Sequence, residues 1–162
     1  MAHNLNYNER TGKYSFFSVQ QKAWHNLGQI VEQYPTSAEA IKYAGLDFEV
    51  IKSPLYTRGT GISIINDGEI KEGGNILLPD NFATMRTDTN TVFGVVGKDY
   101  QIVQNADAFA FFDAIVGGDD GILYETAGAL GNGERIFITA KLPDYMRVGS
   151  GDEVTEKYIF LT

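Results

Sequence analysis

The chain has 162 residues, a length typical of one domain and sufficient to bury a core. Its 13 basic and 21 acidic residues give a formal net charge of −8, which argues against a broad phosphate-binding surface, and the lack of cysteine excludes disulfides, thiolate metal sites and cysteine nucleophiles. Hydrophobic residues make up 43%, which excludes a largely disordered chain. No segment resembles a signal peptide or is apolar over a membrane-spanning length, so we expect a cytoplasmic protein without a membrane partner.

The N-terminal part of the sequence begins with a polar stretch. Residues 1–13 are expected to form a loosely held tail, and YSFFSV (residues 14–19) predicts a first strand. The segment that follows contains AWHNLG, in which Trp24, the only tryptophan, stands beside His25. These two residues form a motif to which the sequence assigns no role.

A short helix and two hairpins are predicted next. Thr36 and Glu39 have the spacing of a capping box, and Gly45 fits the end of the helix that they begin. Two turn signals then lie between apolar runs. They are Asp67–Gly68 and the sequence TDTNT at residues 87–91, and each predicts a β-hairpin.

A second helix is predicted within GKDYQIVQNADAFAFFDAIVGG, residues 97–118. Asn105 is a good N-cap, and Asp107 lies in the first turn, where the helix dipole favours a carboxylate. Apolar side chains recur at helical spacing, namely Phe109, Phe112, Ile115 and Val116. Little polar surface remains, so we expect this helix to lie across a sheet and to be buried on most of its circumference.

The C-terminal part predicts the clearest hairpin, with its turn at residues 131–133 and its end at Pro143. In its second strand, one face carries Ile136, Ile138, Ala140 and Leu142, and the other carries Arg135, Phe137, Thr139 and Lys141. The chain ends within an apolar strand, EKYIFLT. We therefore expect an α+β fold: an antiparallel twisted sheet built from β-hairpins with one or two short helices packed on it, as a single domain over residues 14–162 that is truncated at its C-terminal end.

Motifs for catalysis or cofactor binding are not apparent. His3 lies in the polar tail, and nothing in the spacing supplies His25 with a nucleophile and an orienting group. Asp119–Asp120 is more typical of a solvated turn than of a metal site, and the glycines of GALGNG lie within the predicted hairpin without a phosphate-binding lysine. We therefore expect a protein that is not an enzyme and that has no metal or cofactor.

A weak signal for nucleic-acid binding lies on the last hairpin. Arg135, Phe137 and Lys141 share one strand face, and Arg86 and Lys98 lie on or near neighbouring strands. Cations and aromatic rings on one face can follow a single strand by charge and base stacking. The alternative interpretation is the solvated face of an amphipathic sheet.

Several segments resemble a phage/plasmid-like protein family built on domain of unknown function 932. The resemblance rests on AWHNLG, AEAIKYAGLDFEV, GVVGKDYQIVQNADAFAFFD and ETAGALGNGERIFITAKL, and their order covers most of residues 20–162. It implies that the chain is the N-terminal part of that domain. It also implies a protein of mobile genetic elements that is encoded near replication and recombination genes. The family has no established catalytic residues.

Three functions remain open from the sequence, of which an enzyme whose site uses only aspartate and glutamate is the least favoured. The first is a non-catalytic accessory protein of replication or recombination, of a single-strand-binding or annealing type, with single-stranded DNA or a recombination or replication protein as its partner. The second is an acidic protein-binding module, for example an inhibitor of a host defence or nuclease system, because an acidic surface can imitate the charge of nucleic acid. The sequence leaves the oligomeric state open.

Overall fold

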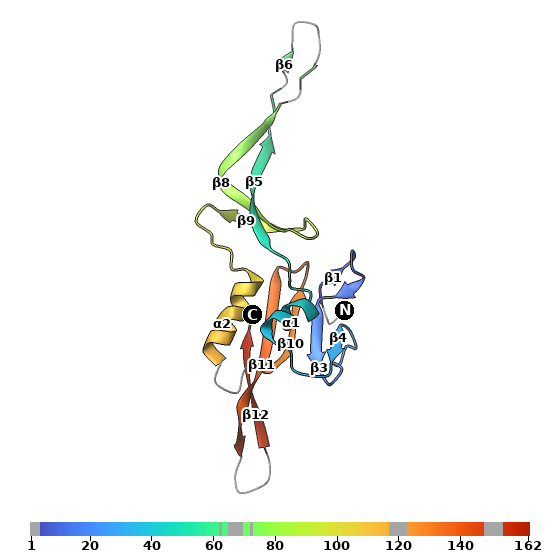
Figure 1. The fold of residues 1–162 in the computed structure, drawn as a ribbon. Coiled ribbons are helices and arrows are strands. Elements are labelled where there is room, and N and C mark those ends of the chain that lie inside the picture. Colours follow the sequence, from blue (N-terminus) through green and yellow to red (C-terminus); the bar gives the residue numbers. More distant parts are fainter. Residues whose placement is uncertain (1–3, 62, 65–69, 72, 117–122, 148–153) are drawn as a thin grey trace. The chain divides into compact units, whose positions relative to one another are not determined.

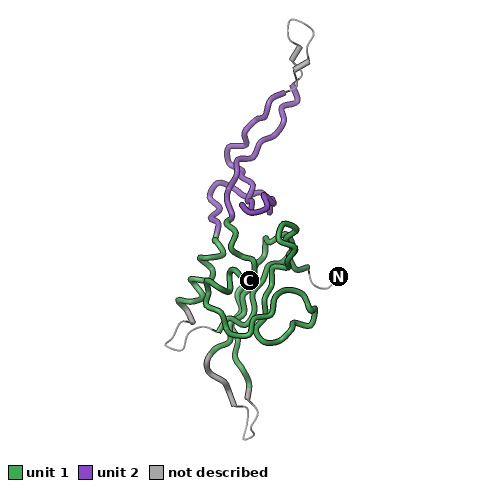
Figure 2. Tube along the Cα trace, turned by 45° about the vertical axis from the view of Figure 1, so that its right-hand side comes forward, with its two compact units in different colours: residues 1–49, 103–162 green, residues 50–102 purple. Residues whose placement is uncertain are grey.

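The computed structural model divides the chain into two compact units, which Figure 2 distinguishes by colour. Unit 1 comprises residues 1–49 and 103–162, and unit 2 comprises residues 50–102. Two compact units can still belong to one folding domain, so the expectation of a single domain stays a prediction. The structure describes residues 4–61, 63–64, 70–71, 73–116, 123–147 and 154–162.

Unit 1 contains a five-stranded sheet in the order β12-β11-β10-β3-β4 (Figure 1). All neighbouring strands pair antiparallel except β3 and β4, which are parallel. The strands are β3 (Phe16–Val19), β4 (Gln29–Val31), β10 (Leu123–Leu130), β11 (Arg135–Arg147) and β12 (Val154–Leu161). Together with two helices, this sheet confirms the predicted α+β class.

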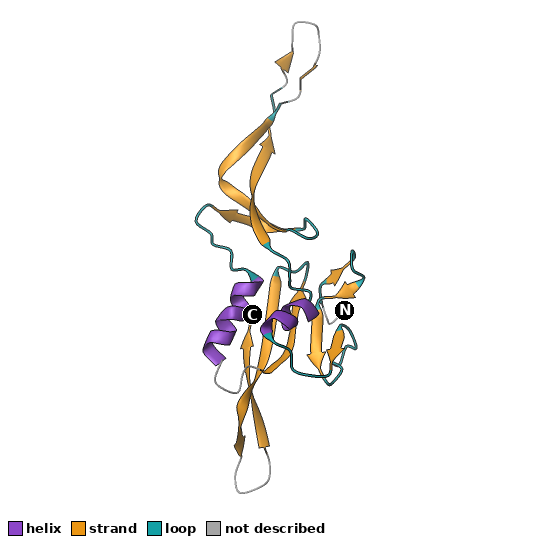
Figure 3. Ribbon diagram, in the orientation of Figure 1, coloured by secondary structure: helices purple, strands orange, loops and turns teal. Residues whose placement is uncertain are grey.

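Both helices, α1 (Ser37–Tyr43) and α2 (Asn105–Val116), pack on one face of this sheet (Figure 3). The ring of Tyr43 in α1 lies 6.2 Å from that of Phe17 in β3. Two phenylalanines of α2 contact Tyr124 in β10, with ring centroids 5.4 Å away for Phe109 and 6.2 Å away for Phe112. The rings of Phe17, Phe109, Phe112 and Tyr124 are almost inaccessible to solvent and belong to the apolar core of the unit.

The helix start predicted at Thr36 is confirmed. The Thr36 hydroxyl accepts from the backbone N–H of Glu39 at 3.4 Å, and the Glu39 carboxylate accepts from the Thr36 backbone N–H at 2.9 Å. These hydrogen bonds stabilise the charged carboxylate and lower the pKa of Glu39. Helix α2 is also confirmed, although the Asn105 side chain is not an N-cap: its amide donates to the Leu46 carbonyl at 2.9 Å.

Residues expected as a loosely held tail are bonded to the sheet. Asn6 is buried; its backbone N–H donates to the Ala129 carbonyl at 2.9 Å, and its side-chain amide donates to the Gly131 carbonyl at 3.1 Å. The Ser15 hydroxyl donates to the Asn6 side chain at 3.0 Å. A short hairpin of β1 (Tyr7–Asn8) and β2 (Lys13–Tyr14) lies between these two residues. One buried amide thus holds a polar segment in place.

Unit 2 is a separate antiparallel sheet in the order β5-β8-β9. Its strands are β5 (Val50–Arg58), β8 (Asn75–Arg86) and β9 (Val92–Gly97), and a small pair of β6 (Ser63–Ile64) and β7 (Ile70–Lys71) adjoins them. The hairpin predicted at residues 87–91 is confirmed, because these residues join β8 to β9. The Asp67–Gly68 turn and the Asp119–Asp120 pair lie outside the described residues.

Strand β11 does not end at Pro143, where the sequence predicted its end. It continues to Arg147, with a register irregularity between Lys141 and Tyr145. The irregularity takes up the local mismatch that a proline introduces into a strand ladder. Within the described residues, no helix combines the length and the apolar character needed to cross a membrane.

Candidate functional site

The face of the five-stranded sheet opposite the helices carries several aromatic rings. Cross-strand register places Phe16, Phe137 and Phe160 on this helix-free face: Gly128 pairs with Phe16 and Phe137, and Thr139 pairs with Phe160. The rings of Phe16 and Phe137 lie 6.1 Å apart. Phe160 is 60% exposed. We define the helix-free face by these three phenylalanines together with Trp24, His25, Arg135, Lys141 and Tyr158.

The AWHNLG motif forms the loop that joins the parallel strands β3 and β4. Parallel strands usually need a connection of a dozen or more residues, and residues 20–28 are fewer than that. Three residues adopt the left-handed conformation to make the connection: Gln20 at φ 59°, Asn26 at φ 56° and Gly28 at φ 86°. Such backbone strain is concentrated at functional sites, so this loop is a candidate for one.

His25 holds Trp24 beside the helix-free face. The Nδ1 atom of His25 accepts from the backbone N–H of Leu27 at 3.0 Å, which fixes the ring within the loop. The His25 ring then lies edge-on to Phe16 at 4.9 Å and to Trp24 at 5.4 Å. Trp24 remains 74% exposed. The AWHNLG motif, to which the sequence assigned no role, therefore presents the large exposed ring of Trp24. This ring lies next to the partly buried ring of His25, which in turn contacts the buried ring of Phe16.

A polar cluster adjoins the rings around Lys141, in the middle of β11. Lys141 bonds to Glu156 in β12, and the Tyr158 hydroxyl donates to the same carboxylate at 2.8 Å. On the other side, Tyr34 hydrogen-bonds to Glu125. Glu125 is the extra residue of a β-bulge between Tyr124 and Thr126.

The interactions in this cluster move the pKa values of four side chains further from neutral pH. The hydrogen bond with Glu156 raises the pKa of Lys141, and the same bond lowers the pKa of Glu156. The Glu156 carboxylate raises the pKa of Tyr158 to about 12, and burial raises the pKa of Tyr34. None of these four side chains is therefore poised to transfer protons near pH 7, and the cluster is better suited to binding than to acid–base chemistry.

The predicted nucleic-acid-binding residues do not form one group. Arg135, Phe137 and Lys141 share one strand of unit 1, as the alternation predicted, and Arg135 is exposed. Arg86 and Lys98 belong to the other compact unit. Sequence reasoning missed Tyr34, Glu156 and Tyr158, because only the tertiary structure brings them near Lys141.

Arg86 is unsuited to the binding role predicted for it, since it is only 2% exposed. Its guanidinium makes a bidentate ion pair with Asp88, with Nε–Oδ1 at 2.7 Å and Nη2–Oδ2 at 2.8 Å. A buried arginine needs such a partner because removing its charge from water is unfavourable. Arg86 is therefore a structural residue of the β8–β9 turn.

Replacing Asp88 with alanine should lower the free energy of unfolding by about 2 kcal/mol, because a buried guanidinium loses its carboxylate. The Arg86 hydrogen bonds lower the pKa of Asp88 below its unfolded value of about 3.9. The pair therefore stabilises the fold above that pH, and the contribution is lost as the pH falls through the folded-state pKa. Urea unfolding at pH 7 and at pH 3 measures both effects. If Asp88→Ala lowers the free energy of unfolding equally at the two pH values, the ion pair does not stabilise the fold in this way.

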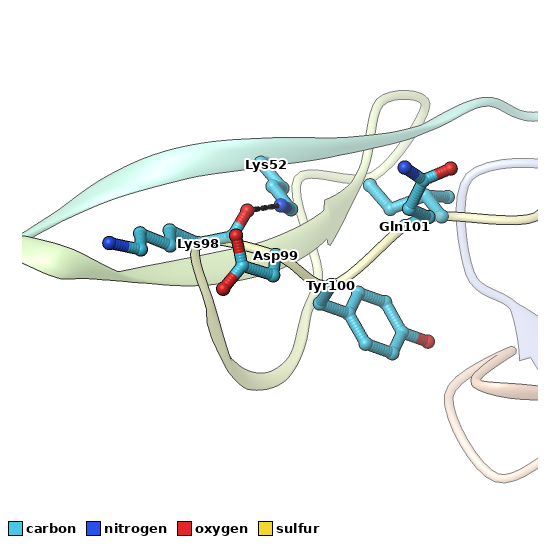
Figure 4. A pocket seen from close by; sticks show the side chains of 6 residues that line it. Lys52, Lys98, Asp99, Tyr100 and Gln101 are labelled. Atoms are coloured by element: carbon cyan, nitrogen blue, oxygen red, sulfur yellow. Dashed lines mark hydrogen bonds between the residues drawn. The ribbon is translucent and has the colours of Figure 1, made fainter.

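Lys98 borders a shallow cavity of about 520 Å³ in unit 2 (Figure 4). Lys52 donates from Nζ to the Lys98 carbonyl at 2.6 Å and lies 5.5 Å from the centre of the Phe82 ring. It therefore fixes the turn that follows β9. The side chains of Lys98, Tyr100 and Gln101 point in different directions and do not converge on a ligand (Figure 4). The Lys98 ammonium lies 3.6 Å from Asp80, and both side chains are largely exposed, so this pair is weak.

Acidic residues are concentrated in unit 1. It has 8 basic and 15 acidic residues, whereas unit 2 has 5 basic and 6 acidic residues. The helix-free face itself has two cations, Arg135 and Lys141, and Glu156 neutralises one of them. No group of three or more histidine, cysteine, aspartate or glutamate side chains could hold a metal ion within the residues that the structure describes.

Comparison with known proteins gives one match. Residues 92–162 match the family model described as "Domain of unknown function (DUF932)". The chain is similar to this family over that segment, which is less than half of its length. No curated protein and no solved structure matches the chain.

The DUF932 segment includes β10, β11 and β12, which carry Phe137, Lys141, Tyr158 and Phe160. It also contains two of the four segments on which the resemblance rested, GVVGKDYQIVQNADAFAFFD and ETAGALGNGERIFITAKL. AWHNLG and AEAIKYAGLDFEV lie before residue 92, so the match is narrower than the resemblance expected from residue 20 onward. The family description assigns no activity to any of these residues.

Proposed function

We propose that the helix-free face binds single-stranded nucleic acid, mainly by stacking bases on its aromatic rings. The observation that supports this most directly is the exposure of Tyr158 and Phe160 on one sheet face of an otherwise acidic unit, with the exposed Trp24 in a loop whose His25 contacts Phe16 of that face. Aromatic side chains on a sheet can stack successive unpaired bases with little dependence on sequence, because every base has a π face. A duplex hides these faces.

Charge makes only a small contribution in this proposal. Arg135 lies beyond Phe137 on β11, and Lys141 lies on the same strand face near Tyr158. These two cations can each contact a phosphate, although Lys141 must then leave Glu156 or share it. Binding should therefore depend on rings more than on ion pairs, in contrast to proteins that bind nucleic acid through a broad basic surface.

We propose further that the protein uses this binding as an accessory protein of replication or recombination in a phage or plasmid. A protein that stacks single strands without reading their sequence would suit strand protection or annealing. This part rests on the resemblance to a phage/plasmid-like family, and the DUF932 match supports the family without assigning the role.

Fluorescence anisotropy with labelled oligonucleotides tests the proposal. The full chain should bind a single-stranded oligonucleotide and should bind the same sequence in duplex form at least tenfold more weakly, a factor of ten being about 1.4 kcal/mol. Equal affinity for the two forms would sink the stacking account, and so would the absence of binding to either.

A second candidate is an acidic protein-binding module. The excess of 15 acidic over 8 basic residues in unit 1 favours it, because a basic cleft of a partner would be attracted to this surface. A chain that ignores oligonucleotides but competes with DNA for a purified basic nuclease would favour this second candidate.

A further inference from the structure

The short hairpin of β1 and β2 carries two exposed tyrosine rings. Tyr7 and Tyr14 are cross-strand partners, and their ring centroids lie 5.0 Å apart at an interplanar angle of 57°. Tyr7 is 50% exposed and Tyr14 is 37% exposed. One exposed ring is ordinary on a protein surface, whereas contiguous exposed apolar surface marks interaction sites. We call these two side chains the tyrosine pair.

Hydrogen bonds at both ends of the hairpin hold the tyrosine pair in a defined position. At the turn, the Asn8 side-chain oxygen accepts from the backbone N–H groups of Arg10 at 3.0 Å and Thr11 at 3.2 Å. At the sheet, Ser15 bonds to the buried Asn6, and its carbonyl accepts from a backbone N–H of β10 at 2.9 Å. A preorganised element loses less conformational entropy when it binds a ligand.

The strand that carries Tyr7 places it on the helix-free side of the five-stranded sheet. Leu5 bridges Leu130, and Leu130 pairs with Arg135 of the helix-free face. Paired residues project to the same side of a sheet, so Leu5 projects to the side of Arg135. Because side chains alternate along an extended segment, Asn6 projects to the other side and Tyr7 again to that of Arg135.

The strand that carries Tyr14 gives the same placement independently. The Ser15 hydroxyl oxygen lies 3.4 Å from the position that a Cβ on Gly45 would take, and Gly45 follows α1. Ser15 therefore projects to the side of the sheet that the helices cover. Its chain neighbours, Tyr14 and Phe16, project to the opposite side. The tyrosine pair thus lies on the same side of the sheet as Phe16, a member of the helix-free face.

The hairpin adds rings to this side of the sheet but little charge. Lys13 pairs with Asn8 and stands next to Tyr14 in the strand, so it projects away from the tyrosine pair. Arg10 and Glu9 are neighbours in the turn, and both are exposed. A ligand that binds by stacking suits this surface better than one that binds through its phosphates.

We propose that the tyrosine pair is a second stacking platform for the single strand that the helix-free face binds. Leu5 is two strand spacings from Arg135, so the backbone of the platform begins about 10 Å from that of Arg135. A short strand then contacts the helix-free face alone, whereas a longer one reaches both platforms and binds more tightly, because the second contact is intramolecular. This inference rests on the proposed function and specifies the length of strand that the chain prefers.

Fluorescence anisotropy of the full chain with labelled single-stranded DNA of about 4 and about 16 nucleotides tests the inference, since single-strand sites span about this range. The wild type should bind the longer strand more tightly. Replacing Tyr7 and Tyr14 together with isoleucine keeps an apolar cross-strand pair but removes both π faces. This variant should bind the longer strand at least about fivefold more weakly, and the shorter one as the wild type does. Its salt dependence should not change, because no cation is lost.

Tyr56→Ile is the matched control, because Tyr56 is 57% exposed on β5 of unit 2 and its replacement should change neither affinity. Replacing Tyr7 and Tyr14 together with phenylalanine keeps both rings and should retain wild-type binding. Circular dichroism shows whether each variant is folded.

Two results overturn the inference. In the first, the double isoleucine variant binds the longer strand as tightly as the wild type does; the proposed function still stands if Trp24→Ala weakens binding. In the second, the double isoleucine variant binds both strands equally more weakly, which would mean that the hairpin acts on the fold of the helix-free face and is not a separate platform. A wild-type chain that binds neither strand contradicts the proposed function and this inference together.

Discussion

Replacing Trp24 with alanine should weaken binding of single-stranded DNA by about 5- to 150-fold, and Phe160→Ala should have an effect of the same order. Both estimates follow from stacking, which contributes about 1–3 kcal/mol per base. The two rings are exposed on the helix-free face, one presented by the loop between β3 and β4 and the other by the edge strand β12. Anisotropy titrations at one fixed salt concentration measure the affinities.

Phe111→Ala is the matched control for this prediction. Phe111 is also an exposed phenylalanine of unit 1, but it lies on α2, which packs on the other side of the sheet. Its replacement should leave affinity unchanged. If Phe111→Ala weakens binding as much as Trp24→Ala does, the site is not the helix-free face; if none of the three changes has an effect, stacking on these rings is not how the chain binds.

Gly28→Ala should lower the free energy of unfolding by about 3 kcal/mol or more. Gly28 has a φ of 86°, where a left-handed conformation costs an L-residue about 1–2 kcal/mol. An added Cβ would also lie 2.5 Å from Phe16 Cδ1 and 2.6 Å from the Phe16 carbonyl oxygen, so overpacking adds about 1–3 kcal/mol. Urea unfolding followed by circular dichroism measures the change.

Gly12→Ala separates the two causes. Gly12 has a similar φ of 67°, but the nearest atom to an added Cβ is the Tyr7 hydroxyl oxygen at 3.9 Å. This variant should lose only the conformational part, about 1–2 kcal/mol. Equal losses in the two variants would mean that Gly28 does not pack tightly against Phe16.

Because Gly28 closes the loop that presents Trp24, its replacement should also weaken single-strand binding in proportion to the unfolded fraction.

Local sequence patterns predicted the elements of this fold well. The Thr36–Glu39 capping box, the helix at residues 105–116 and the hairpin at residues 87–91 all appear in the structure, because each depends on residues close together in the chain. The alternation along β11 also held: Ile138 and Ala140 are fully buried, and Arg135 is exposed.

Features that depend on distant residues were not predicted. The burial of Arg86 depends on the packing of β8 between β5 and β9, and a basic residue in an alternating strand gives no sign of it. The parallel pairing of β3 and β4 was missed because their connection is shorter than the usual crossover. Asn6 was assigned to a polar tail, although its amide bonds with Ser15 and Gly131 hold that segment.

The candidate site was predicted in part. Arg135, Phe137 and Lys141 were identified from their spacing on one strand, and AWHNLG was recognised as a motif without a role. The carboxylate that counters Lys141 could not be predicted, since Glu156 reaches it through the pairing of β11 with β12. This acidic neighbour changes the expected mode of binding from charge to stacking.

The salt dependence of single-strand binding tests this central claim most directly. Anisotropy titrations of the full chain with one labelled single-stranded oligonucleotide at several salt concentrations give the slope of log Kobs against log salt. Each phosphate contact contributes about −0.7 for a single strand, so two cations predict a slope no steeper than about −1.4. A shallow slope with measurable affinity supports stacking on the helix-free face. A slope of about −4 or steeper would mean that an extended basic surface binds the backbone, and would contradict the account.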